Sequence, residues 1–454
     1  GWVRHIKDQT SHTPGNMAIG ASGLPHDEFW SAYFIGLELR ALGINMNFAP
    51  TVDVYVNPDA HVIGPRAFSS DPLETAMLGM AFARGMEDHG VIATAKHFPG
   101  HGNAYGDSHG FLPRVTDSLD TLRNRDLIPY RLMVREGLSA VLSGHVSFPV
   151  ASGEDRPASL SSFFKDRILR DELGFEGIVI TDDLYMGGAS EFAALEGMDL
   201  ADITVAALEA GSDMVMLSVI PQFEGEIWNR VFDRYMEDEA FRANIQESVE
   251  RILRVKLDHL RREDAVPFVP DVNTAMQQVP AEGAREVLRD QAARAITYVY
   301  GEEDFPYVPE PGDRVLLAGS DWTFFQVGRR FFPDARQLRF SERDFYGGSA
   351  ADRQSLVDAV PNYDTVIFCL SDPNMAWLLE SVREYADRII VLSILTPAYL
   401  LEMDWVQRAI AAYGWYGESQ RAAFSVITGQ IEAEGQFPLR FERSDDASSE
   451  DSGQ

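Results

Sequence analysis

The chain has 454 residues, 45% of them hydrophobic, which is enough for two or three domains with a sizeable core. Its formal net charge of −31 excludes the clustered phosphate contacts that nucleic-acid binding needs. Cys369 is the only cysteine, so intramolecular disulfides and cysteine-based zinc sites are excluded, and no apolar run is long enough to predict a membrane span.

Five short apolar segments alternate with helical patterns in the first half of the chain. Continuous apolar strands separated by amphipathic stretches predict a parallel sheet that is covered by helices. The predicted strands are 44–54, 91–98, 138–146, 176–183 and 212–218.

Polar side chains follow the C-terminal ends of these strands. A (β/α)₈ barrel of the TIM type places its chemistry at this edge, and we therefore predict that fold. An open doubly wound sheet binds ligands at the same edge and stays the alternative. The polar residues concerned are Asp53, Lys96, His97, His145, Asp182 and Asp183.

A second strand–helix alternation follows a stretch rich in proline and polar residues, and it predicts a smaller α/β sandwich domain. Its expected strands are 313–321, 364–372, 388–395 and 409–417. The acidic end of the chain is predicted to be disordered. The expected organisation is a barrel over 1–262, a linker and helix over 263–290, the second domain over 291–443 and the tail over 444–454.

The segment "KHFPGHGNAYGDSH" (96–109) concentrates titratable side chains among glycines. Asp107 lies two residues before His109 and can hydrogen-bond its imidazole, which suits a general acid and base near neutral pH. The glycines predict a mobile loop. A solvated polar loop is the alternative for an isolated "DSH".

A metal site in the same segment is a further alternative. Its ligands would be His97, His101, His109 and Asp107. No second cluster completes a tetrahedral set, and the lysine at 96 would repel a cation. We therefore expect no metal and no cofactor.

In "VITDDLYMGGA" (179–189) a buried β segment ends in two carboxylates. Adjacent residues on a strand point to opposite sides, so only one can face the mouth of the barrel. We expect Asp182 to be a nucleophile toward an anomeric carbon and Asp183 to have a structural role such as a helix N-cap. Arg66, in "IGPRAF", could hold sugar hydroxyls, and a surface salt bridge is its alternative.

Taken together, "IGPRAF", "KHFPGHGNAYGDSH", "PASLS" (157–161) and "TDDLYM" (181–186) resemble the motifs of glycoside hydrolase family 3, in its β-N-acetylglucosaminidase branch. The resemblance covers the chain up to about residue 260, and "YGESQRAAFSVITGQIEAEGQFPLRF" is similar to the end of the family's second domain. It implies a retaining exo-acting hydrolase of terminal β-linked N-acetylglucosamine in muropeptides or chitooligosaccharides.

The resemblance also implies residue roles. Asp182 matches the nucleophile and His109 the acid/base, with Asp107 as its partner. Residues that match sugar-holding positions are Lys96, His97 and Arg66, and His145 falls in a strand that lines the pocket.

The chain departs from the family pattern at its start. The family's "DQEGG" aspartate would fall before Gly1, and its arginine would fall on Arg4 or His5. Because only five barrel strands are counted, the first three are expected to be missing, which predicts an incomplete barrel with two open edges.

Two other functions are consistent with the sequence. A histidine base would not repel phosphate as a carboxylate would, so a phosphorylase is possible. A truncated barrel could instead be a non-catalytic sugar-binding protein. The expected partner is a small carbohydrate, whereas the sequence leaves the compartment and the oligomeric state undecided.

Overall fold

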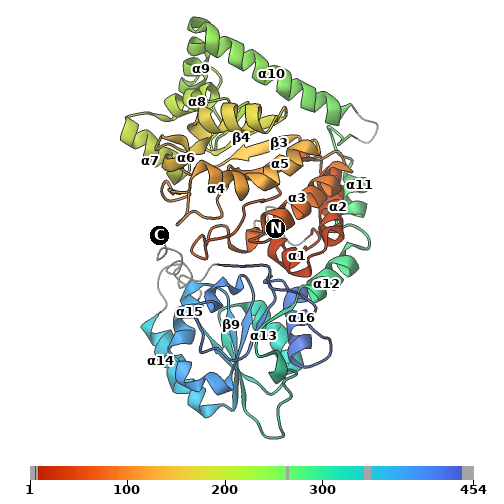
Figure 1. The fold of residues 1–454 in the computed structure, drawn as a ribbon. Helices are drawn as coiled ribbons and strands as arrows, with labels where there is room; N and C mark the ends of the chain where they lie inside the picture. The colour runs from red at the N-terminus through yellow and green to blue at the C-terminus, as the bar shows by residue number, and fades with distance from the viewer. Residues whose placement is uncertain (1–5, 7–8, 262–264, 342–348, 442–454) are drawn as a thin grey trace, which may run out of the picture. The chain divides into compact units, whose positions relative to one another are not determined.

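The computed structural model describes residues 6, 9–261, 265–341 and 349–441 (Figure 1). The chain divides into two compact units. The barrel unit contains Glu28–Ile63, Ala67–Ala281 and the described residues from Leu439 onward. The sandwich unit contains the described residues up to Asp27, together with Gly64–Arg66 and Glu282–Pro438.

The barrel unit contains a curled sheet of five parallel strands in the order β1-β2-β3-β4-β5. Each strand lies inside a segment that the sequence predicted, so the expected α/β class and the five-strand half-barrel are confirmed. Their bounds are β1 Met46–Asn47, β2 Ile92–Phe98, β3 Ala140–Ser143, β4 Ile178–Asp183 and β5 Met214–Met216. Neighbouring strands pair in parallel, with Thr94 opposite Ala140 and Ala140 opposite Ile178.

Helices between the strands bury their apolar sides against this sheet. The helix α3 shows why they form where they do, since Asp71 accepts the N–H groups of Leu73 and Glu74 as an N-cap and a proline occupies the first helical position. The main helices are α2 Pro25–Ala41, α3 Pro72–Glu87, α4 Leu119–Asn124, α5 Leu127–Arg135, the π-helix η3 Phe163–Glu172, α7 Gly187–Glu196, α8 Leu200–Glu209, α9 Glu226–Glu237 and α10 Glu239–Leu260.

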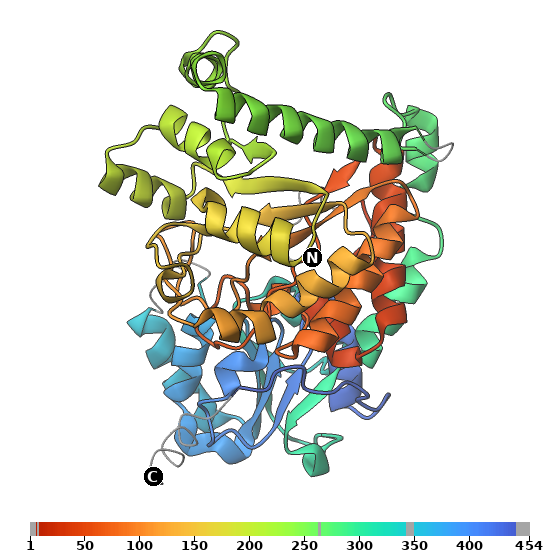
Figure 2. The same cartoon turned by 45° about the horizontal axis from the view of Figure 1, so that its top comes forward.

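The long helix α10 packs against the N-terminal ends of the strands. Its Val255 forms one buried cluster with Ile92, Ala140 and Ile178, which are the first residues of three strands. Both views show the helix lying along the sheet (Figures 1 and 2). The C-terminal ends of the strands lie at the opposite edge of the sheet. The predicted polar side chains lie at this edge.

The sandwich unit contains a six-stranded sheet in the order β6-β11-β10-β9-β7-β8. The four strands expected here are confirmed as β7 Val315–Gly319, β9 Thr365–Leu370, β10 Ile389–Ser393 and β11 Ala409–Ala411. The sequence did not predict β6 Thr297–Tyr300, which pairs antiparallel with β11, or the polar strand β8 Arg336–Arg339. The helices include α12 Ala284–Arg294, α13 Trp322–Phe331, α14 Ala350–Ala359, α15 Pro373–Glu380 and α16 Gly417–Ile427.

The predicted domain boundaries stay a prediction, since the two units do not follow the order of the chain. The expected linker region contains α11 Val272–Gln278 and the start of α12. The expected acidic tail and the positions of Arg4 and His5 lie outside the described residues.

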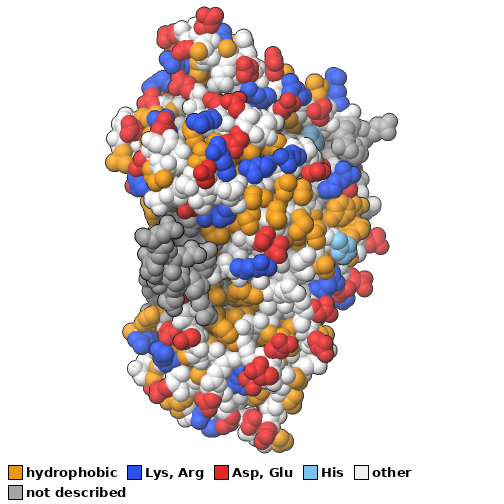
Figure 3. Space-filling view, viewed as in Figure 1, with side chains coloured by type: hydrophobic (Ala, Val, Ile, Leu, Met, Phe, Trp, Pro, Cys, Tyr) orange, Lys and Arg blue, Asp and Glu red, His pale blue; other side chains and the backbone are white. Residues whose placement is uncertain are grey.

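The acidic excess is spread over the surface that Figure 3 shows, where carboxylates alternate with Arg and Lys side chains. Surface pairs such as Arg123–Glu172, at 2.6 Å, belong to this pattern. Among the helices of the described residues, none has a stretch apolar and long enough to cross a bilayer.

Candidate active site

Asp53, one of the polar residues predicted at the strand ends, is fully buried. Its Oδ1 accepts the backbone N–H groups of His97 at 3.1 Å and His101 at 2.7 Å, and its Oδ2 lies 2.7 Å from His97 Nδ1. Burial raises the pKa of Asp53, but the charge and hydrogen bonds of His97 outweigh it, and the pKa is lowered overall. An ionised Asp53 makes Nδ1 the protonated nitrogen of the His97 ring. The sequence placed Asp53 at this edge without giving it a role.

The first half of the histidine-rich segment is built into the sheet edge. Val56 and Asn57 donate their N–H groups to the carbonyl oxygen of Gly102. A Cβ at Gly102 would lie 1.9 Å from the carbonyl oxygen of Val54, so only glycine permits this approach. Asn103 Nδ2 donates to Asp117 at 2.7 Å. These contacts fix the backbone of Gly102 and Asn103, in the middle of the segment.

Asp182 is the penultimate residue of β4 and is partly exposed, which leaves its carboxylate accessible. Burial raises its pKa, but the nearby His97, His145 and Lys96 lower it more, and the pKa is lowered overall. The backbone N–H of Asp183 donates to Asp182 Oδ1 at 2.9 Å. The structure therefore brings three predicted site residues around an ionised Asp182.

His145 is 1% exposed, and both of its ring nitrogens have partners inside the protein. Nε2 lies 2.9 Å from the carbonyl oxygen of Asp183, and Nδ1 lies 2.6 Å from Ser159 Oγ. A carbonyl only accepts, so Nε2 carries the proton and Ser159 donates to Nδ1. Burial lowers the pKa of His145 against the attraction of Asp182, which favours this neutral form. These contacts favour a positioning role, and its predicted contact with the sugar stays a prediction.

Asp107 and His109 form the pair that the sequence suggested. Asp107 Oδ1 lies 2.6 Å from His109 Nδ1 and also accepts the backbone N–H of His109 at 2.9 Å. Both side chains are exposed. The hydrogen bond from His109 lowers the pKa of Asp107, although partial burial opposes it. An ionised Asp107 keeps the proton on His109 Nδ1 as its hydrogen-bond donor. This leaves His109 Nε2 as the ring nitrogen that exchanges protons.

The start of helix α7 holds the loop that carries this pair. Gly187 donates its N–H to the carbonyl oxygen of His109 at 3.0 Å, and Gly188 donates to that of Ser108 at 2.8 Å. Glu191, on the same helix, accepts the N–H of Leu112 at 2.6 Å. The helix that follows Asp182 therefore holds the loop that carries Asp107 and His109.

Both glycines are required by the close approach of the loop. A Cβ at Gly187 would lie 2.4 Å from the carbonyl carbon of Gly110, and a Cβ at Gly188 would lie 2.9 Å from His145 Cβ. The sequence did not predict this contact between the helix and the loop. Its signal was the pair of glycines directly after "TDDLYM", which sequence alone does not distinguish from a flexible turn.

Arg66 ends the 3₁₀-helix η1 Gly64–Arg66 in the sandwich unit, where its carbonyl oxygen accepts Asn16 Nδ2 at 2.8 Å. Its predicted grip on the sugar stays a prediction. Among the residues that the structure describes, no three His, Cys, Asp or Glu side chains are grouped so that they could hold a metal ion.

A curled parallel sheet with an ionised carboxylate and histidines at the C-terminal ends of its strands is the arrangement of a barrel-type α/β enzyme. The family model described as "Glycosyl hydrolase family 3 N terminal domain" matches residues 1–255. The chain belongs to this family, and the resemblance seen in the sequence is confirmed.

Curated relatives carry a consistent name. The chain is 34% identical over 276 residues to "Beta-hexosaminidase A" of Pseudoalteromonas piscicida, which covers 56% of this chain and 45% of the relative. It is 37% identical over 233 residues to "Beta-hexosaminidase" of Thiobacillus denitrificans, which covers 50% of this chain and 63% of the relative. The chain thus spans less than two thirds of the length of these relatives.

Solved structures agree over nearly the whole chain. A family 3 β-N-acetylglucosaminidase from Paenibacillus sp. str. FPU-7 has a TM-score of 0.81 and 29% identity, covering 97% of this chain and 84% of that one. A fungal multi-domain family 3 β-N-acetylglucosaminidase has a TM-score of 0.85 and 25% identity, covering 98% of this chain and 52% of that one. The two-domain fold of this family is therefore shown for this chain.

Proposed function

We propose that this chain is a retaining exo-β-N-acetylglucosaminidase that releases terminal β-linked N-acetylglucosamine from muropeptides or chitooligosaccharides. The observation that carries the proposal is the carboxylate of Asp182 near the end of β4, together with the Asp107–His109 pair on a loop that is hydrogen-bonded to the start of α7. The lowered pKa of Asp182 agrees with a nucleophile. The names of the curated relatives support the same activity.

In the proposed mechanism Asp182 attacks the anomeric carbon while His109 Nε2 donates a proton to the departing glycosidic oxygen. This step forms a glycosyl ester on Asp182 and breaks the glycosidic bond. His109, now neutral, takes a proton from water, and the resulting oxygen nucleophile displaces the carboxylate from the sugar. Lys96 and His97, held at the end of β2, are the proposed contacts to sugar hydroxyls.

A phosphorylase is the second candidate, because the proposed base is a histidine and not a carboxylate. Phosphate could approach an uncharged base without the repulsion that a carboxylate would exert. The product would then be N-acetylglucosamine 1-phosphate. A solved β-glucoside phosphorylase shares this fold, with a TM-score of 0.80.

The test measures nitrophenol release from the aryl β-N-acetylglucosaminide and from the matching β-glucoside, with and without phosphate. Preference for the acetamido sugar, abolished by Asp182→Asn, would support the proposal. Acceleration by phosphate with formation of the sugar phosphate would assign the phosphorylase activity. Sugar binding without turnover of either substrate would contradict both and assign a non-catalytic binding protein.

A further inference from the structure

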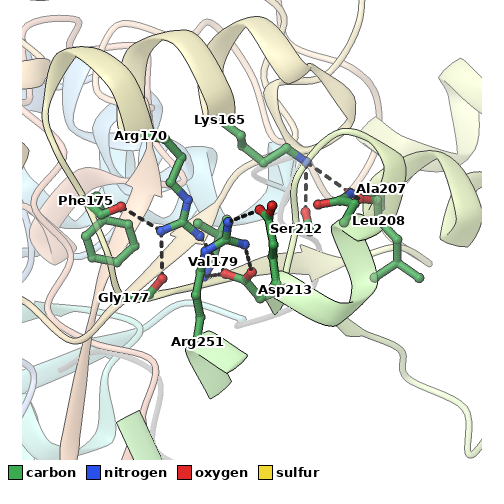
Figure 4. A network of polar contacts seen from close by, with 12 residues as sticks. Lys165, Arg170, Phe175, Gly177, Val179, Ala207, Leu208, Ser212, Asp213 and Arg251 are labelled. Carbon is green, nitrogen blue, oxygen red and sulfur yellow. Dashed lines mark hydrogen bonds and ion pairs between the residues drawn. The ribbon is translucent and has the colours of Figure 1, made fainter. Parts of the chain in front are cut away.

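Lys165 is one of four lysines in the chain and is 0% exposed in the π-helix η3. Its Nζ donates to the carbonyl oxygen of Ser159 at 2.5 Å, to Ser212 Oγ at 2.8 Å and to the carbonyl oxygen of Ala207 at 3.3 Å. Figure 4 shows its amine pointing toward Ala207 and Ser212. None of these three acceptors is a carboxylate, and an ammonium group buried in this way costs free energy of folding.

Ser159 connects this lysine with the proposed active site. Its carbonyl oxygen accepts from Lys165, and its hydroxyl donates to His145 Nδ1 at 2.6 Å. His145 in turn donates from Nε2 to the carbonyl oxygen of Asp183, the residue next to Asp182. Every side chain along this path from Lys165 to His145 is at most 1% exposed.

Backbone contacts couple the same two segments. Ser159 lies in the 3₁₀-helix η2 Ala158–Leu160, which donates N–H groups to the carbonyl oxygens of Gly144 and Val146. These two residues flank His145. A shift of Ser159 would therefore move the histidine that supports the end of β4.

Arg170, on the same helix, has a different environment. It pairs with the buried Asp213 at 2.7 Å and donates to the carbonyl oxygens of Phe175 and Gly177, in the segment directly before β4 (Figure 4). Its contacts are those of a structural ion pair. Arg170 thus contacts the segment directly before β4, whereas Lys165 is linked to the other end of β4 only through Ser159 and His145.

We propose that Lys165 is a positioning residue for Asp182, acting through Ser159 and His145 to fix the carboxyl end of β4. The inference rests on the proposed function. It explains why a lysine without a hydrogen-bonded carboxylate is kept inside the protein. Burial lowers the pKa of Lys165 to about 7, against the attraction of Asp166 and Asp213.

The decisive variant is Lys165→Met, which keeps the length of the side chain and removes the charge and the donors. We expect kcat for the aryl N-acetylglucosaminide to fall by about 10- to 100-fold, because small displacements of a reacting group cost this much. KM should change less than about threefold, since no predicted sugar contact is touched. The melting temperature should change by only a few degrees, because the removal of a buried charge offsets the loss of a donor to three buried acceptors.

The matched control is Arg170→Met in the same helix. It leaves Asp213 with Arg251, at 2.9 Å, as its remaining arginine partner, so the melting temperature should fall while kcat stays within about threefold. Ser159→Ala, which keeps the carbonyl acceptor and removes the hydroxyl, should lower kcat as Lys165→Met does. The double variant should show less than the product of the two losses, because both act through His145.

A lower melting temperature with unchanged kcat in Lys165→Met would overturn the inference and leave a purely structural lysine. Hydrogen exchange at residues 181–186 tests the same point without activity, and Lys165→Met should accelerate it more than Arg170→Met does. If Asp182→Asn retains full turnover, the proposed function fails. If it abolishes turnover while Lys165→Met changes neither kcat nor exchange, only the lysine inference fails.

Discussion

Gly188 donates its backbone N–H to the carbonyl oxygen of Ser108 at 2.8 Å, and this contact fastens the loop that carries His109 to the helix that follows Asp182. Asp182 and His109, the proposed catalytic pair, are 73 positions apart in the sequence. Asp182 lies in β4, whereas His109 lies in the loop after β2. Their relative positions therefore depend on backbone hydrogen bonds between the loop and the helix α7, and not on either side chain.

Replacing Gly187 by alanine should disturb the contact between the loop that carries His109 and the start of α7. The added Cβ would lie 2.4 Å from backbone of the loop, so the loop must move, and we expect kcat to fall by at least about tenfold. The matched control is Gly417→Ala, also at the first position of a helix, where the Cβ would meet only a methyl group of Thr323 at 3.7 Å. Steady-state kinetics of both variants checks the prediction, and equal kcat values would contradict it.

His109→Ala should discriminate between leaving groups. A nitrophenolate leaves without protonation, whereas a sugar hydroxyl needs the acid, so the loss of kcat/KM should be greater for chitobiose than for the aryl glycoside by at least about tenfold. Asp107→Asn should show the same order with smaller losses, because it keeps the imidazole and removes its charged partner. Equal losses on both substrates would show that His109 is not the proton donor.

Asp53→Asn should abolish most of the activity without removing a group that touches the sugar. The amide no longer stabilises the protonated Nδ1 of His97, which lies 2.7 Å away, and it also weakens the hydrogen bond from His101. We expect a loss of about 100-fold or more in kcat/KM. Kinetics with the aryl glycoside checks this, and a nearly unchanged value would exclude Asp53 as the anchor of the site.

The buried carboxyl group of Asp126 should make the free energy of unfolding depend on pH. Burial raises its pKa to about 6, although Arg125 opposes the shift. A carboxyl with a raised pKa in the folded state contributes stability below about pH 4, and this contribution is lost as the pH rises through 6. The free energy of unfolding of Asp126→Asn, relative to that of the wild type, should therefore rise by on the order of 3 kcal/mol between pH 4 and 7. Urea unfolding measures this difference.

Asp53→Asn provides a control of opposite sign for this measurement. The pKa of Asp53 is lowered in the folded protein, so its contribution is present above about pH 4 and is lost as the pH falls through the lowered value. Relative to the wild type, Asp53→Asn should lose stability as the pH rises from 2 to 5. The same slope in both variants would contradict the assignment of these two carboxyl groups.

The sequence by itself determined the features that depend on neighbouring residues. Apolar segments bounded by polar residues located the five barrel strands and four strands of the second sheet. The two-residue spacing of Asp107 and His109 determined their hydrogen bond, because an Asp side chain reaches the backbone and ring of the second residue onward. The polar residues at the strand ends followed from the same local pattern.

Only the tertiary structure decided what those residues contact. Asp53 reaches His97 and Gly187 meets the loop because strands and helices distant in the chain pack together, which local spacing does not encode. The strand β8 is polar and recognisable only from its pairing with β7. Lys165 looks like a surface residue in the sequence, and its burial is set by the long-range packing of η3 against Ser159 and Ser212.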